Sequence, residues 1–346
     1  MSAKLGRRVR VCFSPALMIC LLLWARSASA QSEITLVSTG SSLPEPLYLA
    51  WGDEYHKAHP SVKVRYLPEG TAESSRKILA GIGDIGGGDA PNPEKELKNA
   101  AIPILELPSV LIGVVIVYNL PQTPGELRFS GPALADIFLG KIKMWNDPEL
   151  VKLNPGLKLA ARPIQVIHRS AGKGSNYILS DFLSKVSPEF LVKAGRSESP
   201  RWPVGKSAGR AQDMADLVKT TPWSIGYTER QLAETASLRI ARIRNASGEF
   251  VMPTKESIAA AASESKIKSD FRVSLTNAPG KSSYPISSFT WFYVPTRSKE
   301  AERGRAVAEY LKWIYGNGQV IALQRGYATL PKELLAKVAA SAATVH

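Results

Sequence analysis

Apolar and polar positions alternate along the chain with two different periods. Short apolar runs typical of strands are separated by longer stretches in which apolar residues recur every three or four positions, as on one face of a helix. Strands are predicted at residues 34–37, 62–67 and 85–88, and helices at 46–59 and 73–81. In the first helix the apolar face consists of Leu47, Trp51, Tyr55 and Ala58. Short strands that alternate with helices predict an α/β fold.

The same alternation continues in the second part of the chain. Residues 105–119 form a long apolar run of strand character, and Pro108 near its start is interpreted as a crossover into a second domain. A helix is predicted at 132–139 with Ser130 as its N-cap. The remaining predicted elements are a strand at 164–168, a helix that Ser175 opens, a strand at 289–294, and helices at 299–315 and around Val320.

The first 30 residues have the pattern of a secretory signal peptide. Basic residues from Lys4 to Arg10 precede an apolar stretch at 11–25, and small residues then lead to a predicted cleavage site after Ala30. Lipidation at Cys20 is an alternative, but the residue before it is Ile19 rather than a small one. No later stretch approaches the roughly 18 apolar residues of a membrane span, so we expect the mature chain to be soluble.

Cysteine content and charge indicate the compartment. Cys12 and Cys20 are the two cysteines of the chain and both lie in the predicted leader, so the mature chain is expected to have no disulfide and no thiolate site. Without the five basic residues of the leader, 39 Lys and Arg face 30 Asp and Glu, a net charge of +9. The basic residues are scattered, which favours a surface that attracts small anions over a nucleic-acid partner. We expect a periplasmic protein.

Four polar clusters carry the candidate chemistry. They are Ser41-Ser42, Gly70-Thr71, Asp89 after three glycines, and the run at 169–175. Each is predicted to lie in a loop next to a helix. Glycines allow backbone N–H groups to approach a ligand, hydroxyls add donors, and a helix N-terminus favours an anion. Together the clusters predict a cage for an oxyanion.

Eight motifs occur in order over nearly the whole chain. They are Ser-Ser-x-Pro-x-Pro-x-Tyr at 41–48, Gly-Asp-Ala-Pro at 88–91, Leu-Ala-Asp-Ile-Phe-Leu-Gly-Lys-Ile-Lys-x-Trp-Asn-Asp at 134–147, Leu-Asn-Pro-Gly-Leu-Lys-Leu at 153–159, Arg-Trp-Pro-Val-Gly at 201–205, Ile-Gly-Tyr at 225–227, Tyr-Pro-Ile at 284–286 and Tyr-Ala-Thr-Leu-Pro at 327–331. The motif at 134–147 is the most specific. With these motifs the chain resembles the periplasmic phosphate-binding component of phosphate ABC transporters, the PstS family.

This resemblance implies a type II periplasmic-binding-protein fold. Two α/β lobes would be joined by two hinge crossings, near residues 107–112 and 287–289, with the ligand in the cleft between the lobes. Lobe I is expected to contain residues 31–110 and 289–346, and lobe II residues 111–288. The implied function is capture of inorganic phosphate and its delivery to the membrane permease of an ABC transporter, by a monomer without a cofactor.

The chemistry of the clusters agrees with a phosphate ligand. Phosphate keeps a proton near neutral pH, so Asp89 would accept that proton and would repel fully ionised sulfate. Arg169 offers a planar fork for two oxygens. Further donors are predicted in the hydroxyls of Ser42, Thr71 and Ser175 and in the amides of Leu43, Gly174 and Ser175. Another tetrahedral oxyanion is the alternative ligand.

The chain departs from the family pattern around the arginine. Lys173 stands where the family commonly has a serine, Ser175 where it has a threonine, and Ala171 where an aspartate often partners the arginine. Lys173 is predicted either to contact the ligand and loosen anion selectivity, or to point to solvent at the cleft rim. Glu69 or Glu73 is the hypothetical replacement for the missing partner of Arg169.

A catalytic function has weaker support. Residues 205–209 match the Gly-x-Ser-x-Gly pattern of hydrolases, but Pro203 disrupts the strand expected before it, so no catalytic residue is assigned. His56 and His59 have a spacing that suits a metal pair, yet no third ligand is evident and no metal site is predicted. An exported phosphate-ester hydrolase remains the alternative to a binding protein.

Overall fold

The computed structural model describes residues 33–346, and the chain from Ile34 to His346 forms one compact unit. The predicted signal peptide, with Cys12 and Cys20, lies outside the described residues. Among the described residues, no helix has the length and apolar character needed to cross a membrane.

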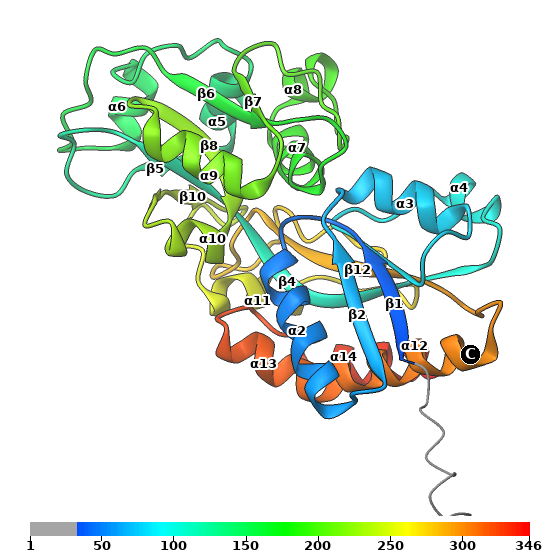
Figure 1. Cartoon of the computed structure of the whole chain (residues 1–346). Helices are drawn as coiled ribbons and strands as arrows, with labels where there is room; N and C mark the ends of the chain where they lie inside the picture. Colours follow the sequence, from blue (N-terminus) through cyan, green and yellow to red (C-terminus); the bar gives the residue numbers. More distant parts are fainter. Residues whose placement is uncertain (1–32) are drawn as a thin grey trace, which may run out of the picture. The chain divides into compact units, whose positions relative to one another are not determined.

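Strands and helices alternate over most of the described chain (Figure 1). The strands are β1 (Ile34–Thr39), β2 (Val62–Leu67), β3 (Ile85–Gly88), β4 (Ile104–Asn119), β5 (Arg128–Phe129), β6 (Gln165–Arg169), β7 (Lys206–Ala208), β8 (Ser224–Glu229), β9 (Arg239–Ile240), β10 (Arg242–Arg244), β11 (Phe250–Val251) and β12 (Ser287–Pro295). The helices are α2 (Glu45–Ala58), α3 (Thr71–Leu79), α4 (Glu94–Lys98), α5 (Gly131–Phe138), α6 (Pro148–Leu153), α7 (Gly174–Val186), α8 (Pro188–Lys193), α9 (Ala211–Thr220), α10 (Arg230–Thr235), α11 (Lys255–Ser263), α12 (Ala301–Trp313), α13 (Gln319–Gln324) and α14 (Lys332–Ala342).

Most of these strands belong to one mixed sheet. Its order within residues 33–346 is β2-β1-β3-β12-β4-β8-β6-β7, and β9 pairs with β4 beside this path. The pairs β1–β2, β1–β3, β6–β8 and β6–β7 are parallel, whereas β12 and β4 run antiparallel to their partners. The fold is therefore the predicted α/β fold, with antiparallel strands between two parallel groups.

The 16-residue strand β4 connects these two groups. Its first part, up to Gly113, pairs with β12, and its second part, from Val114 onward, pairs with β8. Nearly every residue of β4 is buried, which explains why the sequence shows an apolar run rather than an alternating pattern. Pro108, interpreted as a crossover, lies inside β4 where the register with β12 shifts, a position that tolerates a residue without an N–H. The lobe boundaries at 110/111 and 288/289 stay predictions.

The family-specific stretch at 134–147 proves to be largely core. Leu134, Ile137 and Phe138 of α5 are fully buried, and Ser130 caps the helix by accepting the N–H of Ala133 at 3.2 Å, as predicted. The indole of Trp145 is also fully buried and donates to the backbone oxygen of Trp223 at 2.9 Å. Buried side chains of this stretch thus contribute to the packing of the core.

Most predicted elements occur within a few residues of their expected bounds. The helix expected to begin at Ser175 begins one residue earlier, at Gly174, with Lys173 as its N-cap. The helices expected at 299–315 and around Val320, α12 and α13, are joined without a break by a π-helical segment, Ile314–Gly318. The oxygen of Gly318 accepts the indole N–H of Trp51 at 2.7 Å, which anchors this segment to α2.

A buried acid at the end of β8 makes stability depend on pH. Glu229 is only 3 % exposed, and its carboxylate accepts the N–H of Leu232 at 3.2 Å. Burial raises the pKa of Glu229 to about 7. The folded state therefore holds the proton of the Glu229 carboxyl more tightly than the unfolded state does. The stability that this proton contributes is complete below the unfolded pKa and is lost as pH rises to about 7.

We therefore expect Glu229→Gln, which keeps the acceptor oxygen but cannot ionise, to be more stable than the parent protein by about 1–3 kcal/mol at pH 8. At pH 5 the two proteins should be nearly equal. Urea unfolding at both pH values measures the difference, with the exposed Glu249→Gln as control. An equal change in stability between pH 5 and pH 8 in parent and variant would contradict this account.

Candidate anion-binding site

Four segments that are distant in sequence meet at the ends of strands. Ser41 and Ser42 follow β1, Asp89 follows β3, Arg169 ends β6, and Thr71 begins α3. In parallel sheets, ligands bind beyond the carboxyl ends of strands, where loops gather. These side chains are between 0 and 8 % exposed, so together they form a desolvated polar cluster, which we call the cage.

Arg169 is the central cation of the cage. It is 1 % exposed, and no carboxylate among residues 33–346 forms an ion pair with it. Its guanidinium donates to the backbone oxygens of Ala208 at 3.3 Å and Gly209 at 2.9 Å, and to the hydroxyl of Ser42 at 3.3 Å. The hydroxyl of Ser175 lies 3.5 Å from its Nη1. Burial lowers the pKa of Arg169, although an arginine remains charged at every ordinary pH.

Asp89 is the one acid among these donors. It is fully buried; its Oδ2 accepts the hydroxyl of Ser41, while Oδ1 has no hydrogen-bond partner among the described residues. Burial raises its pKa to about 6, against opposing contributions from Ser41, Thr290 and the charge of Arg169. The carboxyl is therefore mainly ionised at neutral pH and presents a free acceptor atom.

The N-terminus of α7 closes the cage from the other side. Gly174 is its first residue, and a Cβ there would overlap Asp89 and lie 2.5 Å from Oγ1 of Thr71. The same Oγ1 accepts the N–H of Asp89 at 3.2 Å. Ser175, the next residue of α7, is 1 % exposed. Glycine is thus required at 174 for the backbone to approach so closely.

Two predicted donors already have protein partners. The N–H of Leu43 donates to Oγ of Ser41 at 3.1 Å. The ammonium group of Lys173 donates to the backbone oxygen of Glu69 at 3.1 Å, next to the cage, and burial together with the charge of Arg169 lowers its pKa. The side chain of Lys173 therefore does not extend into solvent, and its ammonium group already has a hydrogen-bond acceptor. It links the turn before α7 to the loop before α3.

The hypothesis that Glu69 or Glu73 replaces the missing partner of Arg169 is wrong. Glu69 pairs with Lys77 at 2.6 Å, and Glu73 pairs with Arg76 at 2.6 Å. Both acids have nearer cations on α3, so neither reaches the arginine. Arg169 consequently has no ion-pair partner within residues 33–346, although the charge of Asp89 acts on it from within the cage.

Sequence reasoning missed the residues that hold the cage in place. The hydroxyl of Tyr227 accepts the backbone N–H of Arg169 at 2.9 Å and donates to Asn176 on α7. Oγ1 of Thr290 lies within hydrogen-bonding distance of Tyr48 and donates to the backbone oxygen of Gly88 at 3.2 Å. The Ile-Gly-Tyr motif contains Tyr227 and could have indicated its role. Thr290 lies in an apolar strand, and no sequence pattern indicated that it supports the cage.

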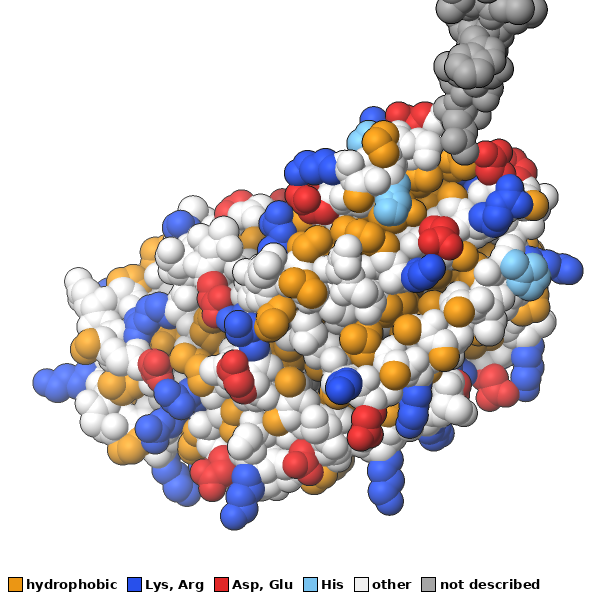
Figure 2. Space-filling model, turned by 90° about the horizontal axis from the view of Figure 1, so that it is seen from below, with side chains coloured by type: hydrophobic (Ala, Val, Ile, Leu, Met, Phe, Trp, Pro, Cys, Tyr) orange, Lys and Arg blue, Asp and Glu red, His pale blue; other side chains and the backbone are white. Residues whose placement is uncertain are grey.

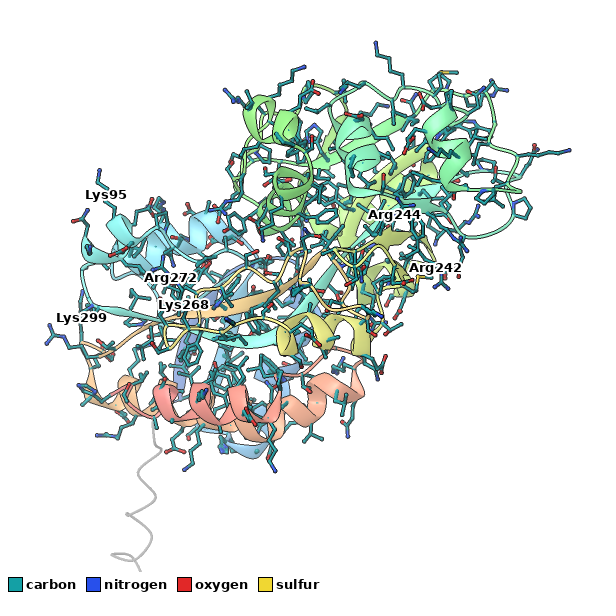
Figure 3. The ribbon with its side chains drawn as sticks, turned by 180° about the vertical axis from the view of Figure 1, so that it is seen from behind. Lys95, Arg242, Arg244, Lys268, Arg272 and Lys299 are labelled. Atoms are coloured by element: carbon teal, nitrogen blue, oxygen red, sulfur yellow. The ribbon has the colours of Figure 1, made fainter. Side chains whose placement is uncertain are left out.

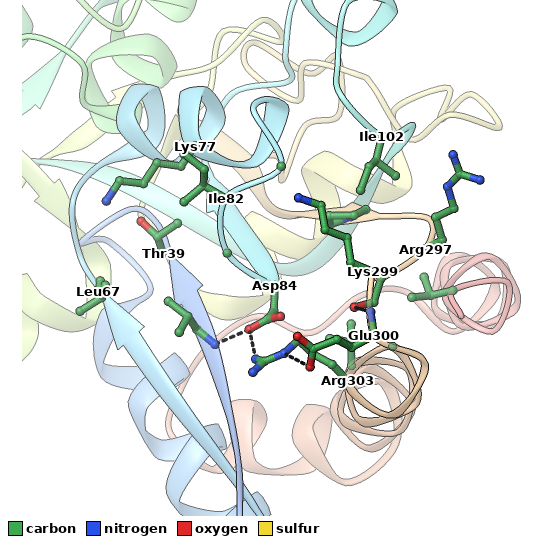
Figure 4. Close-up of a pocket in the computed structure, with 18 residues that line it drawn as sticks. Thr39, Leu67, Lys77, Ile82, Asp84, Ile102, Arg297, Lys299, Glu300 and Arg303 are labelled. Atoms are coloured by element: carbon green, nitrogen blue, oxygen red, sulfur yellow. Dashed lines mark hydrogen bonds and ion pairs between the residues drawn. The ribbon is translucent and has the colours of Figure 1, made fainter.

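A second cavity lies away from the cage. Its volume is about 430 Å³, and it is lined by β1, the start of α12 and the segment before α12 (Figure 4). Asp84 accepts the N–H of Val37 at 2.7 Å and pairs with Arg303 at 3.0 Å, and Arg303 also lies 3.6 Å from Glu300. Arg297 and Lys299 also line this cavity, but both are exposed to solvent, so the cavity lacks a buried unpaired cation such as Arg169.

Other basic residues are spread over the surface. On the face shown in Figure 2, Lys and Arg side chains alternate with Asp and Glu. Lys95 on α4, Arg242 and Arg244 on β10, and Lys299 before α12 lie on separate elements (Figure 3). Within the described residues, no group of three or more His, Cys, Asp or Glu side chains is placed to hold a metal ion.

Comparison with known proteins gives a consistent result. A family model described as a PBP superfamily domain matches residues 25–317. The phosphate-binding protein PstS of Pasteurella multocida is 35 % identical over 326 residues, covering 93 % of this chain and 94 % of that protein. The PstS of Xylella fastidiosa is 36 % identical over 317 residues, covering 91 % of this chain and 86 % of that protein.

A solved structure supports the two-lobed fold. The phosphate-binding protein from Stenotrophomonas maltophilia superposes with a TM-score of 0.67 at 19 % identity, covering 89 % of this chain and 94 % of that chain. At this identity the likeness concerns the fold alone, whereas the sequence matches cover most of both chains. The chain therefore belongs to the PBP superfamily and, within it, to the family of PstS phosphate-binding proteins.

Proposed function

We propose that this protein captures inorganic phosphate in the cage and delivers it to the membrane permease of an ABC transporter. The relatives of this chain are named phosphate-binding proteins, which supports the ligand. The main support is the environment of Arg169. Its side chain is only 1 % exposed, and its guanidinium has no ion-pair partner among residues 33–346. A buried charge is costly unless it is paired, so an anionic ligand is its natural partner.

Asp89 explains why phosphate is favoured over sulfate. Its Oδ1 is buried and has no hydrogen-bond partner among the described residues. A hydrogen phosphate ion carries a proton that it can donate to this oxygen, whereas sulfate at neutral pH offers only acceptors. Sulfate would thus place two buried acceptors against each other, which costs binding free energy.

The other residues of the proposed site have distinct roles. The hydroxyls of Ser42, Thr71 and Ser175 and the amides of Gly174 and Ser175 surround Arg169 and Asp89 and would donate to the ligand. The amide of Leu43 would need to exchange its bond to Ser41 for one to the anion. Lys173 would add positive potential near the cage while it bonds to Glu69.

Delivery requires a protein that opens and closes. In our proposal the two lobes, bounded as predicted from the sequence, close over phosphate and present it to the permease as a monomer in the periplasm. The predicted signal peptide at 1–30 supports this location. We assign no catalytic role to the protein.

Calorimetric titration of residues 31–346, freed of bound anion, with phosphate and then with sulfate tests the proposal. We expect a phosphate Kd below about 1 μM, equivalent to about −8 kcal/mol, and sulfate binding at least about 100-fold weaker at pH 7.5. Equal affinity for the two anions, or no binding of phosphate, would contradict it.

Arg169→Lys tests the arginine. Lysine keeps the positive charge but loses the planar fork that donates to two oxygens at once, so we expect phosphate affinity to fall by about 100-fold or more. Circular dichroism and thermal unfolding show whether the variant is folded. Lys185→Arg, on the far part of α7, is a control for a conservative change of cation. Unchanged affinity of a folded Arg169→Lys protein would remove the arginine from the site.

Asp89→Asn tests the acceptor, because an amide can donate to sulfate. We expect the phosphate-over-sulfate ratio to fall by about 10- to 100-fold at pH 7.5, since about 1.4 kcal/mol corresponds to each factor of ten. In the parent protein, sulfate binding should strengthen below pH 6, where Asp89 becomes protonated, and this pH effect should vanish in the variant. The exposed Asp216→Asn is the matched control. A ratio as high in Asp89→Asn as in the parent would refute the role.

A further inference from the structure

A cavity of about 800 Å³ borders the cage. Ala72 and Ala90 line it, and these are the chain neighbours of the cage residues Thr71 and Asp89. Its opposite wall consists of Tyr177 on α7 and residues 196–198 before β7.

Glu198 is an acid in this wall with a fixed backbone and a free carboxyl. Its backbone oxygen accepts the N–H groups of Gly172 at 3.0 Å and Lys173 at 3.2 Å, and the side-chain amide of Asn176 at 2.9 Å. These donors belong to the turn before Gly174 and to the first turn of α7. The half-buried carboxyl itself has no hydrogen bond or ion pair within residues 33–346.

The cations around this cavity are already engaged. Arg76 on α3 pairs with Glu73 at 2.6 Å. Arg196 pairs with Asp181 at 3.2 Å and lies over the ring of Tyr177. Just before α7, the ammonium group of Lys173 donates to the backbone oxygen of Glu69.

The acids that act on Glu198 are Asp89, inside the cage, and Glu96, on α4. Burial, followed by these two negative charges, raises the pKa of Glu198 to about 7. The carboxyl therefore lacks a compensating cation and lies within the electrostatic reach of the anion site.

We propose that Glu198 couples anion capture to the uptake of a proton, so that the cleft binds phosphate more readily when this carboxyl is neutral. The inference rests on the proposed function. An ionised carboxylate near the cage repels a phosphate dianion, and by reciprocity the bound dianion favours the protonated carboxyl. The proton comes from the buffer and binds the carboxylate oxygen, and no covalent bond in the ligand changes.

The test is calorimetric titration with inorganic phosphate at pH 7.5 in two buffers of different ionisation enthalpy, which gives the number of protons taken up per anion. We expect the parent protein to take up a larger fraction of a proton than Glu198→Gln. The variant should bind phosphate about 3- to 10-fold more tightly than the parent at pH 8, and with equal affinity at pH 5.5. High salt should reduce the difference.

Glu249→Gln is the control, since Glu249 is an exposed acid that is not among the charges acting on Glu198. We expect it to behave as the parent does. Equal proton uptake in parent and Glu198→Gln, or a variant with weaker binding at every pH, would overturn the role of Glu198 while leaving the proposed function intact. Failure of the parent protein to bind phosphate at any pH would overturn both.

Discussion

The buried charge of Arg169, which has no ion-pair partner among the described residues, is the constraint on which the proposed site depends. A guanidinium buried without a direct ion pair carries a desolvation cost of several kcal/mol, which the surrounding structure or a ligand has to offset. Here the offset is partial: two backbone oxygens and the hydroxyl of Ser42 accept its N–H groups, and all of these acceptors are neutral. In our proposal, an anionic ligand supplies the remaining favourable interaction with this charge.

The fold places no carboxylate of the described residues in an ion pair with Arg169. Arg169 is positioned by β6, held by Tyr227 on β8, and faced by the N-terminus of α7. The acids nearest in sequence to the loops of the cage, Glu69 and Glu73, are paired with cations on α3. Asp89 remains as an acid in the cage, and its bond to Ser41 leaves one oxygen free.

Much of the fold could be predicted from the sequence, since strands and helices differ in hydrophobic period. Strand β2 and most of α2 lie where the pattern placed them. The register shift at Pro108 inside β4 was not predictable, because it depends on the pairing with β12, a partner about 180 residues away. The continuity of α12 and α13 through a π-helical segment likewise depends on tertiary contacts such as that of Trp51 with Gly318.

The site was predictable in its residue types but not in its pairing. Glycines, hydroxyls, one acid and one arginine indicated an anion cage, and the structure gathers Ser42, Thr71, Asp89, Arg169 and Ser175. Which acid pairs with which base is decided by geometry across the fold. The sequence therefore suggested that Glu69 pairs with Arg169, whereas Glu69 pairs with Lys77. The sequence also gave no indication that Glu198 lies near the cage.

A crystal structure of the protein grown with phosphate tests the central claim most directly. The account predicts one anion in the cage, with two of its oxygens on the guanidinium of Arg169 and a third within hydrogen-bonding distance of Oδ1 of Asp89. An anion bound elsewhere, or one in the cage that leaves Asp89 without a contact, would contradict it.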